Sequence, residues 1–440
     1  MVKILIKKKI KNFNKVINVD GDKSISIRSL LIASQSYGVC KIKNLPKSED
    51  ILSTINGLKK LGIKIFFKKK TCFIHGNGLN GFKYKKNIII DAGNSGTFAR
   101  LLLGLLVRTP YEVKIIGDKS LSKRDFQRII DPLNQFGAKF VSSNNKKLPL
   151  KILGSNYLRP INYFEKKGSA QCKSSVIFAA LNTPGKTIIN AKKSRNHTEL
   201  FLKYLNLPLK VVSKKKIDLI EVFGEKQFKS FEYIVPGDIS SSAFFIVLTL
   251  LAKNSRLKIK NVNINPSRTG FIKIINKMGA KVKFINKKKI CGEQLADICV
   301  KSQKNFKPIH CPIELNSNAI DEFLIIFLLA SKASGISYFR KLEELNKKES
   351  PRLKIVSKIL KQMGVKIKAD DCSIKIFGNP ELTIKKKIFI KNYHKDHRIF
   401  MTSVIAALCL GGEWVIEDMD SYKSSFPSFI NILRKIGYIF

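Results

Sequence analysis

The sequence predicts an α/β fold with two domains, built from six βαβαββ units whose helices are buried and whose sheets lie outside them. Three observations support this prediction: the length of the chain, a pattern that recurs at helix ends, and a second pattern that recurs at helix starts. At 440 residues the chain exceeds the size at which one hydrophobic core usually keeps growing, so two domains are the default expectation.

The first pattern marks helix ends. It has the form Leu/Ile-x-x-apolar-Gly-apolar, runs into a β-like stretch, and occurs at Gly62, Gly137, Gly279, Gly364 and Gly437. A degenerate copy in residues 205–210 has Pro208 at the glycine position. Glycine suits the residue after the last helical turn, because that residue often takes a positive φ. Neighbouring copies of this pattern lie 71 to 85 residues apart, which is the length of a βαβαββ unit. Six such units fill the chain.

The second pattern is a polar segment that opens an apolar helix. It recurs in step with the first, at residues 24–34, 95–106, 169–181, 238–251, 319–330 and 396–410. Helices that are apolar nearly all round are buried, so we expect these six at the centres of the lobes. Their first turns are rich in Ser, Asp, Asn, Thr and Gly, which cap helices and leave backbone N–H groups for an anion. For any single helix, an ordinary N-cap is the alternative interpretation.

Lysine dominates the charge of the chain. The formal net charge is +50, from 82 Lys and Arg against 32 Asp and Glu, and such a charge first suggests nucleic acid. The lysine triplets, however, recur along the whole chain beside short apolar stretches, as solvated hairpin ends would, at residues 7–9, 68–70, 214–216, 287–289 and 385–387. We therefore expect no nucleic-acid partner.

Other features of the composition indicate a cytoplasmic protein. No apolar run reaches the roughly 18 residues that a membrane span needs, so we expect no membrane association. The basic residues 1–14 lack the apolar stretch and cleavage site of a secretion signal. The eight cysteines form no CxxC pair, which favours reduced, buried thiols.

Arginine is rare and gathers in polar motifs. Of 13 arginines, seven lie in the motifs described next, namely 28, 100, 124, 195, 268, 352 and 398. Lysine supplies almost all the other positive charges of the chain. An arginine therefore indicates a position where a planar guanidinium binds a carboxylate or phosphate.

The first half of the chain carries four motifs suited to anion binding. Gly-Asp-Lys-Ser-Ile-Ser-Ile-Arg places Lys23 and Arg28 around two serines, which predicts a phosphate clamp, although no P-loop is present. Residues 93–100 allow close approach of the backbone to a ligand, and residues 117–124 add a further cation. Residues 168–173 supply hydroxyl, amide and ammonium donors. Two weaker strings, residues 194–198 and 266–270, look more like turns with a cation.

The second half of the chain adds carboxylates. Asp321 and Glu322 open an apolar helix, where dipole compensation is the alternative to a catalytic role. Residues 348–352, Lys-Glu-Ser-Pro-Arg, place an acid between two bases at a predicted helix start, and residues 396–398, Asp-His-Arg, begin the sixth helix. His394 and His397 have a metal-like spacing without a third ligand, so we expect no metal.

These motifs, in this order and across essentially the whole chain, resemble the EPSP synthases, a family of the inside-out α/β barrel type. The matching strings are Gly-Asp-Lys-Ser-Ile-Ser, Gly-Asn-Ser-Gly-Thr, Gly-Ser-Ala-Gln-x-Lys-Ser, Val-Pro-Gly-Asp-Ile-Ser-Ser, Lys-Glu-Ser-x-Arg, Asp-His-Arg and Ser-Phe-Pro. Repeat and resemblance together imply three units per lobe, with one lobe of residues 21–236 and another of residues 1–20 plus 237–440. The hinge would lie near residues 20–22 and 235–238, with the substrates in a cleft between the lobes.

The resemblance implies transfer of the enolpyruvyl group of phosphoenolpyruvate to the 5-hydroxyl of shikimate 3-phosphate, with phosphate released from a tetrahedral intermediate. This is a step of the shikimate pathway to aromatic amino acids, it uses no cofactor, and we expect a monomer. The implied ligands of shikimate 3-phosphate are Lys23, Ser24, Arg28, Ser169, Gln171, Ser194, Asp321 and Lys348. Those of phosphoenolpyruvate are Lys23, Gly96, Arg124, Gln171, Arg352 and Arg398.

The same resemblance implies the catalytic groups. Asp321 would take the hydroxyl proton, and Glu349, together with Lys23, would handle the proton at C3. His397 would orient the site or shuttle a proton. A phosphoenolpyruvate-binding lysine of some members falls at Ser424 here, so the neighbouring Lys423 is a further candidate ligand. Four other positions depart from the usual family residues without removing a catalytic group: Asp20, Ile27, Asp125 and Pro351.

Two alternatives remain at this stage. A UDP-N-acetylglucosamine enolpyruvyl transferase shares the architecture, but it has Lys-Asn where this chain has Lys23-Ser24, and a loop cysteine that no residue between Gly96 and Arg124 supplies. A basic nucleic-acid-binding protein is the alternative from another class, and steeply salt-dependent binding to DNA or RNA would identify it.

Overall fold

The computed structural model describes residues 2–142 and 146–439. The chain divides into two compact units. Unit I consists of Met1–Asp20, Pro236–Lys288 and Gln294–Phe440, and unit II consists of Gly21–Val235 and Lys289–Glu293. The five residues Lys289–Glu293, expected in the lobe of residues 237–440, group with unit II.

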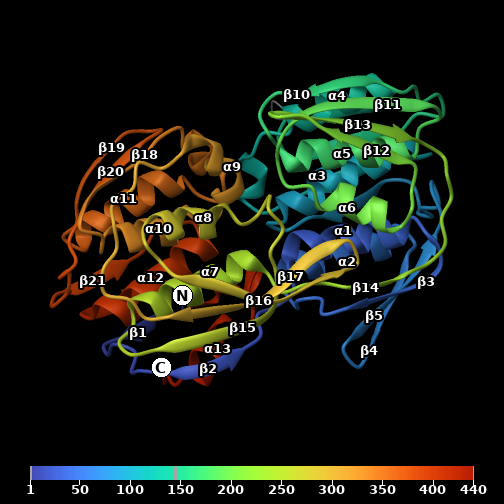
Figure 1. Cartoon of the computed structure of the whole chain (residues 1–440). Coiled ribbons are helices and arrows are strands. Elements are labelled where there is room, and N and C mark those ends of the chain that lie inside the picture. Colours follow the sequence, from blue (N-terminus) through green and yellow to red (C-terminus); the bar gives the residue numbers. More distant parts are fainter. Residues whose placement is uncertain (1, 143–145, 440) are drawn as a thin grey trace. The chain divides into compact units, whose positions relative to one another are not determined.

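Unit II contains three four-stranded sheets of one topology, each with one parallel pair followed by two antiparallel pairs (Figure 1). The first sheet has the order β14 (Glu232–Ile234), β3 (Tyr37–Lys43), β5 (Thr71–Asn77) and β4 (Lys64–Lys68). The second is β6 (Ile88–Asp91), β7 (Val113–Ile116), β9 (Leu150–Leu153) and β8 (Lys139–Ser142). The third is β10 (Asn162–Glu165), β11 (Lys186–Lys192), β13 (Ile217–Phe223) and β12 (Leu209–Ser213). This repeated topology is that of a βαβαββ unit.

Unit I also contains three sheets. The first is β16 (Val282–Ile290), β17 (Glu293–Lys301), β15 (Arg256–Asn263) and β2 (Asn14–Ile17). The second is β18 (Gly335–Phe339), β20 (Ile374–Gly378) and β19 (Lys366–Ala369), and the third is β1 (Ile4–Ile6), β22 (Glu413–Ile416) and β21 (Lys387–Ile390). Strands β1 and β2, from the start of the chain, therefore complete two sheets whose other strands come from its second half.

Two sets of helices pack against these sheets. Unit II has α1 (Lys23–Ser34), α2 (Glu49–Lys60), α3 (Gly96–Leu105), α4 (Gln127–Phe136), α5 (Ala170–Leu181) and α6 (His197–Tyr204). Unit I has α7 (Ile239–Leu251), α8 (Gly270–Lys277), α9 (Asn316–Ala319), α10 (Phe323–Ala330), α11 (Arg352–Gln362), α12 (His397–Leu410) and α13 (Phe429–Lys435). The predicted α/β fold with buried helices and outer sheets is confirmed, and both units show it.

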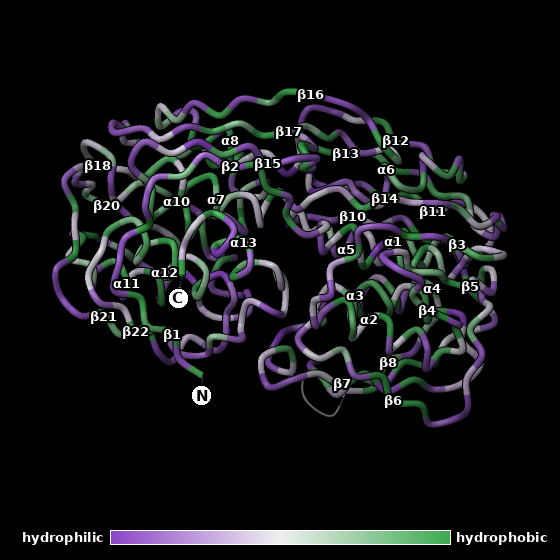
Figure 2. Tube along the Cα trace, turned by 90° about the horizontal axis from the view of Figure 1, so that it is seen from below, coloured by the Kyte–Doolittle hydropathy of each residue, from purple (hydrophilic) through white to green (hydrophobic). Residues whose placement is uncertain are grey.

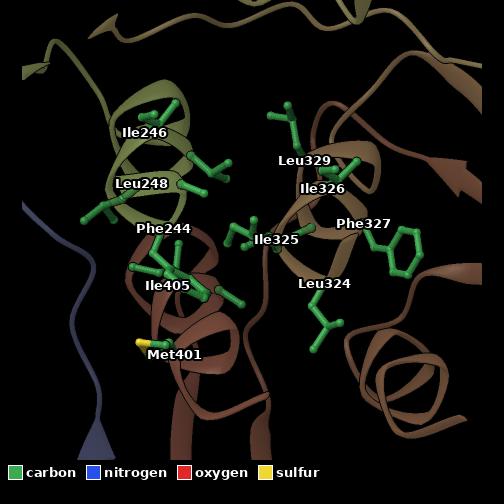
Figure 3. Close-up of a cluster of buried hydrophobic side chains, with 14 of the residues drawn as sticks. Phe244, Ile246, Leu248, Leu324, Ile325, Ile326, Phe327, Leu329, Met401 and Ile405 are labelled. Carbon is green, nitrogen blue, oxygen red and sulfur yellow. The ribbon is translucent and has the colours of Figure 1, made fainter. Parts of the chain in front are cut away.

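The helices predicted to be buried form the core of each unit. Helices α1, α3 and α5 are almost wholly inaccessible in unit II, as are α7, α10 and α12 in unit I. In Figure 2, hydrophobic segments run along these helices, and hydrophilic ones predominate in the outer strands and loops. Figure 3 shows the core of unit I, where side chains such as Phe244, Ile325 and Ile405 from its three central helices meet. Full burial of one such side chain contributes about 1.5–3 kcal/mol.

The predicted helix ends are confirmed at the glycines and wrong at the degenerate copy. All five glycines take positive φ, between 83° at Gly364 and 113° at Gly137. In the sixth copy the left-handed residue is Asn206, with φ of 53°, which directly follows the C-cap Leu205 of α6. Pro208 cannot take a positive φ, because its ring fixes φ near −65°.

Two further expectations need correction. The segment 319–330 is not one helix, because α9 ends at Ala319 and α10 begins only at Phe323, so Asp321 and Glu322 lie in the turn between them. The lysine triplets 68–70 and 214–216 do lie at hairpin turns, but residues 287–289 lie within β16 with exposed side chains. Among the described residues no helix combines the length and hydropathy of a membrane span.

Candidate active site

Five of the six buried helices begin with a side chain that caps them. Asp22, Ser95 and Ser169 in unit II accept hydrogen bonds from the first-turn amides of α1, α3 and α5. Asp238 and Asp396 do the same for α7 and α12 in unit I. The exception is α10, which no side chain caps in this way. The polar residues at these helix starts therefore do act as N-caps, and binding roles rest on the side chains beside them.

Lys23 is the first residue of α1, and its ammonium is held by a carboxylate from the next helix. Lys23 Nζ lies 2.9 Å from Oδ2 of Asp50, in the first turn of α2. The side chains of Lys23 and Asp50 are only 17% and 7% exposed, so solvent screens this pair weakly. Sequence reasoning missed Asp50, because an acid in a first turn is commonly explained by the helix dipole.

Arg28, one turn further along α1, is almost fully buried and bonded to protein. Its Nε donates to Thr198 Oγ1 at 2.8 Å, its Nη1 to the carbonyl of Ser24 at 2.9 Å, and its Nη2 to Ser174 Oγ at 3.0 Å. The guanidinium is therefore fixed in one orientation before any ligand binds.

Two guanidinium groups converge on the first residue of α3. A Cβ added to Gly96 would lie 2.9 Å from Nη1 of Arg124 and 3.0 Å from Nη1 of Arg100. Arg124 is held by Asn94 Oδ1 at 2.9 Å, and Arg100 donates to Gln171 Oε1 at 2.8 Å. This arrangement concentrates positive charge at the helix start, and the absence of a side chain at Gly96 leaves room for both guanidinium groups.

The remaining predicted ligands of unit II lie on or before α5 and α6. Gln171 also donates from Nε2 to Thr97 Oγ1 at 2.9 Å, so its amide bridges α5 and α3. Ser194 Oγ is buried and has no hydrogen-bond partner among the described residues. A buried hydroxyl without a protein partner is uncommon and is consistent with a position reserved for a ligand.

In unit I the predicted acids and bases gather around one buried arginine. Arg352 is 1% exposed, and its Nη2 donates to Glu349 Oε2 at 2.5 Å. Its Nη1 lies 3.4 Å from Asp321 Oδ1, and Lys348 Nζ lies 3.6 Å from the same oxygen. Both predicted catalytic carboxylates, from segments 28 positions apart, thus contact one guanidinium.

A third carboxylate anchors that guanidinium. Asp396 is fully buried and accepts from Arg352 Nε at 2.9 Å and from Ser350 Oγ at 2.8 Å. Burial alone would raise the pKa of Asp396, but the charge of Arg352, its hydrogen bond and the charge of His397 together hold this pKa below its usual range. Burial would likewise lower the pKa of Arg352, and the charges of Asp396 and Glu349 instead raise it. Arg352 is therefore a permanent cation at the centre of this cluster.

Arg398 differs from Arg352 although both were predicted as ligands. It is 8% exposed, and its guanidinium makes no hydrogen bond or ion pair with the described residues. A largely buried cation without a protein partner is costly, which favours a bound anion as its partner.

Two further candidates are His397, the neighbour of Arg398 in the sequence, and Lys423. His397 contacts Ser424 Oγ at 3.3 Å through Nδ1. The side chain of Lys423 is half exposed and pairs with Asp420 at 2.6 Å.

Comparisons with known proteins identify the family of this chain. The sequence profile described as EPSP synthase (3-phosphoshikimate 1-carboxyvinyltransferase) matches residues 7–433. The chain is 42% identical over 422 residues to the 3-phosphoshikimate 1-carboxyvinyltransferase of Ruthia magnifica subsp. Calyptogena magnifica, covering 96% of this chain and 95% of the relative. It is 36% identical over 437 residues to that of Zymomonas mobilis, covering 98% and 96%. The chain belongs to the EPSP synthase family.

Solved structures extend the EPSP synthase likeness to the fold. The structure of EPSP synthase from Acinetobacter baumannii has a TM-score of 0.86 and 32% identity, covering 99% of this chain and 98% of that one. The enolpyruvyl transferase NikO from Streptomyces tendae has a TM-score of 0.78 at 14% identity, covering 99% and 97%, and shows the shared fold alone.

The structure brings seven of the predicted EPSP synthase residues into two clusters. In unit II, Arg124 lies against Gly96 at the start of α3, and Gln171 contacts Thr97 and Arg100 of that helix from α5. In unit I, Asp321, Lys348, Glu349 and Arg352 form a second cluster. Asp50, Asn94, Thr97 and Arg100 were missed as partners of these groups, because each pairs with a residue that only tertiary folding brings near. Among the described residues no group of three His, Cys, Asp or Glu side chains could hold a metal ion.

Proposed function

We propose that the side chains described above carry out the reaction of the EPSP synthase family. Enolpyruvyl is transferred from phosphoenolpyruvate to the 5-hydroxyl of shikimate 3-phosphate, with release of phosphate, in the shikimate pathway to aromatic amino acids. The observation that carries this proposal is the contact of Asp321 and Glu349 with the single guanidinium of Arg352. The reaction needs one base and one acid, and this cluster supplies a carboxylate for each.

We assign the proton transfers to these two carboxylates. Asp321 accepts the proton of the 5-hydroxyl as that oxygen attacks C2 of phosphoenolpyruvate. Glu349, with Lys23, delivers the proton to C3, which turns the methylene into the methyl group of the tetrahedral intermediate. The same groups then remove a proton from that methyl as phosphate leaves C2, which restores the double bond of the enolpyruvyl product. A carboxylate near C2 also stabilises the positive character that develops there.

The position of Arg352 suggests how Glu349 becomes an acid. A nearby cation favours the charged form of a carboxyl group, and Arg352 Nη2 contacts Glu349 directly. The carboxylate of phosphoenolpyruvate, when it binds Arg352, competes with Glu349 for this donor. Loss of that contact removes an interaction that favours the charged form of Glu349, so substrate binding itself prepares the proton donor.

We assign the binding of the phosphate and carboxylate groups of the substrates to cationic side chains and helix starts. Shikimate 3-phosphate is assigned to Lys23, Ser24, Arg28, Ser169, Gln171, Ser194, Asp321 and Lys348. Phosphoenolpyruvate is assigned to Lys23, Gly96, Arg124, Gln171, Arg352 and Arg398, and His397 and Lys423 are further candidates. The guanidinium of Arg398, which has no hydrogen bond or ion pair with the described residues, supports an anion there. The ion pair of Lys423 with Asp420 argues against a role for Lys423.

One assay tests the reaction. The purified protein is mixed with phosphoenolpyruvate and shikimate 3-phosphate, and inorganic phosphate is measured. We expect phosphate release that requires both substrates and no added metal. Replacement of shikimate 3-phosphate by UDP-N-acetylglucosamine should abolish it. Release with the nucleotide sugar, or with phosphoenolpyruvate alone, would refute the assignment.

We further propose a monomeric, cytoplasmic enzyme whose hinge lies near residues 20–22 and 235–238. The chain passes from one unit to the other at Asp20–Gly21 and Val235–Pro236. All eight cysteines are free, and four of them are buried, which suits a reducing compartment. Size-exclusion chromatography with light scattering tests the monomer, and a mass near twice 49.8 kDa would exclude it.

A further inference from the structure

Four side chains form a buried polar junction between α5 and the start of α6, and none was assigned a role in catalysis or binding. They are Lys173 and Ser174 on α5, and Thr198 and Glu199 on α6. Lys173 Nζ lies 2.6 Å from Glu199 Oε1, and Ser174 Oγ lies 2.7 Å from Thr198 Oγ1. All four are at most 3% exposed as residues.

The junction also holds the side chain of Arg28. Thr198 accepts from Nε and Ser174 from Nη2, so both hydroxyls of the Ser174–Thr198 pair contact the guanidinium. A further contact, from Nη1 to the carbonyl of Ser24, stays within α1. Three helices therefore meet at this junction, and its two hydroxyls set the orientation of the guanidinium relative to α5 and α6.

Stability alone does not account for the ion pair at the junction. A buried pair loses its hydration, and replacing both partners by apolar residues of similar volume is often neutral or stabilising. Glu199 Oε2 is buried without a hydrogen-bond partner among the described residues, which adds to the cost. A neighbouring pair, His197 Nδ1 with Glu293 Oε1 at 2.6 Å, is buried as well but involves a different segment. Buried charged groups fix the register of helices in some proteins, and we take the Lys173–Glu199 pair to do so between α5 and α6.

The segments joined here carry most of the shikimate 3-phosphate ligands proposed for unit II. Helix α1 carries Ser24 and Arg28, the start of α5 carries Gln171, and Ser194 lies just before α6. The guanidinium of Arg124, assigned to phosphoenolpyruvate, is instead held by Asn94 and Ser120. The junction and the Arg124 site therefore have separate supports.

We propose that the polar junction of Lys173, Ser174, Thr198 and Glu199 positions Arg28 in the shikimate 3-phosphate site and does not position Arg124 of the phosphoenolpyruvate site. Its members are positioning residues that act through Arg28 and through the register of α5 with α6. This inference rests on the proposed function, because it takes Arg28 as a ligand of shikimate 3-phosphate.

The first test loosens the Arg28 side chain. Thr198→Val and Ser174→Ala each remove one acceptor from the guanidinium. We expect the KM for shikimate 3-phosphate to rise about 10-fold in each variant, as loss of a charged hydrogen bond predicts, with the KM for phosphoenolpyruvate within about 2-fold of wild type. In an Arg28→Ala background, Thr198→Val should cause no further rise. Equal rises for both substrates, or additive effects in the double variant, would overturn the proposal.

The second test replaces the ion pair. Lys173→Met alone leaves a buried carboxylate and can fail to fold, so the double variant Lys173→Met/Glu199→Met is used. We expect it to keep the wild-type melting temperature within a few degrees and to show a KM for shikimate 3-phosphate raised about 10-fold. A folded double variant with wild-type KM would assign the pair a purely structural role.

A binding measurement separates failure of this inference from failure of the proposed function. Titration calorimetry of the wild-type protein with shikimate 3-phosphate should give a measurable Kd. Absence of binding to wild type would refute the proposed function and the junction together. Binding to wild type with unchanged affinity in Thr198→Val would refute the junction alone.

Discussion

The two units share one architecture but differ in the charged side chains at the starts of their buried helices. In unit II the buried helices begin beside cations, and two guanidinium groups crowd Gly96 at the start of α3. In unit I three carboxylates surround Arg352 at the turn before α10 and at the starts of α11 and α12. The repeat supplies helix starts in both units, and under the proposed function the few residues at those starts decide between anion binding and proton transfer. Variants in the two units should therefore fail in different ways.

The largest effect is expected from the carboxylates of unit I. Asp321→Ala and Glu349→Ala should each lower kcat about 100-fold or more, in keeping with general acid–base contributions. Phosphate release at saturating substrates measures this. Glu344→Ala, which removes an exposed carboxylate paired with Lys347, is the matched control and should keep near wild-type turnover. Turnover near wild type in either catalytic variant would remove that residue from its role.

Arg398 tests whether unit I also binds an anion. Its guanidinium makes no hydrogen bond or ion pair with the described residues, so Arg398→Ala removes no known protein contact of that group. We expect the KM for phosphoenolpyruvate to rise about 10-fold or more, while thermal stability stays at or above that of wild type. Arg434→Ala, in the exposed last turn of α13, is the control. A large loss of stability with unchanged KM would show a structural role instead.

Gly96→Ala tests the crowding in unit II. The added methyl would meet the ends of two flexible arginine side chains, so the guanidinium groups can shift and the fold should be kept. Their displacement should raise the KM for phosphoenolpyruvate about 5-fold with a smaller change in kcat. Gly279→Ala has open space around its Cβ and serves as a packing control, although its φ of 89° carries backbone strain. An unchanged KM in Gly96→Ala would separate this helix start from phosphoenolpyruvate.

The sequence predicts what depends on local pattern. Buried helices and their caps follow from composition and spacing, and the five glycines take the expected positive φ. The local pattern failed at two places. Asn206, and not the position of Pro208, takes the positive φ after α6, and a turn at Asp321 interrupts the segment predicted as one helix. The motifs also identified most candidate site residues.

The partners of those residues could not be predicted, because they are set by tertiary packing. Asp50 reaches Lys23 from another helix, and Thr198 reaches Arg28 across 170 positions. An acid in a first turn, or a threonine in a string interpreted as a turn, has too many ordinary explanations to be chosen from sequence. Only the folded arrangement shows which charges are buried together.

The smallest effect is expected in acid, from Asp396. Its pKa lies below the ordinary value, near 3.9, of an unfolded aspartate, because the charge and hydrogen bond of Arg352, with the charge of His397, together outweigh the effect of burial. Such a depressed pKa contributes stability that is fully present above about pH 4 and is lost as the pH falls through the folded-state value. Urea unfolding of wild type should therefore show stability falling below about pH 4. Asp396→Asn should be less stable at neutral pH, because Arg352 loses a partner, yet show a shallower decline in acid than wild type. Asp371→Asn, at an exposed carboxylate, is the matched control. An acid decline in Asp396→Asn as steep as that of wild type would mean that this carboxylate does not link the stability of unit I to pH.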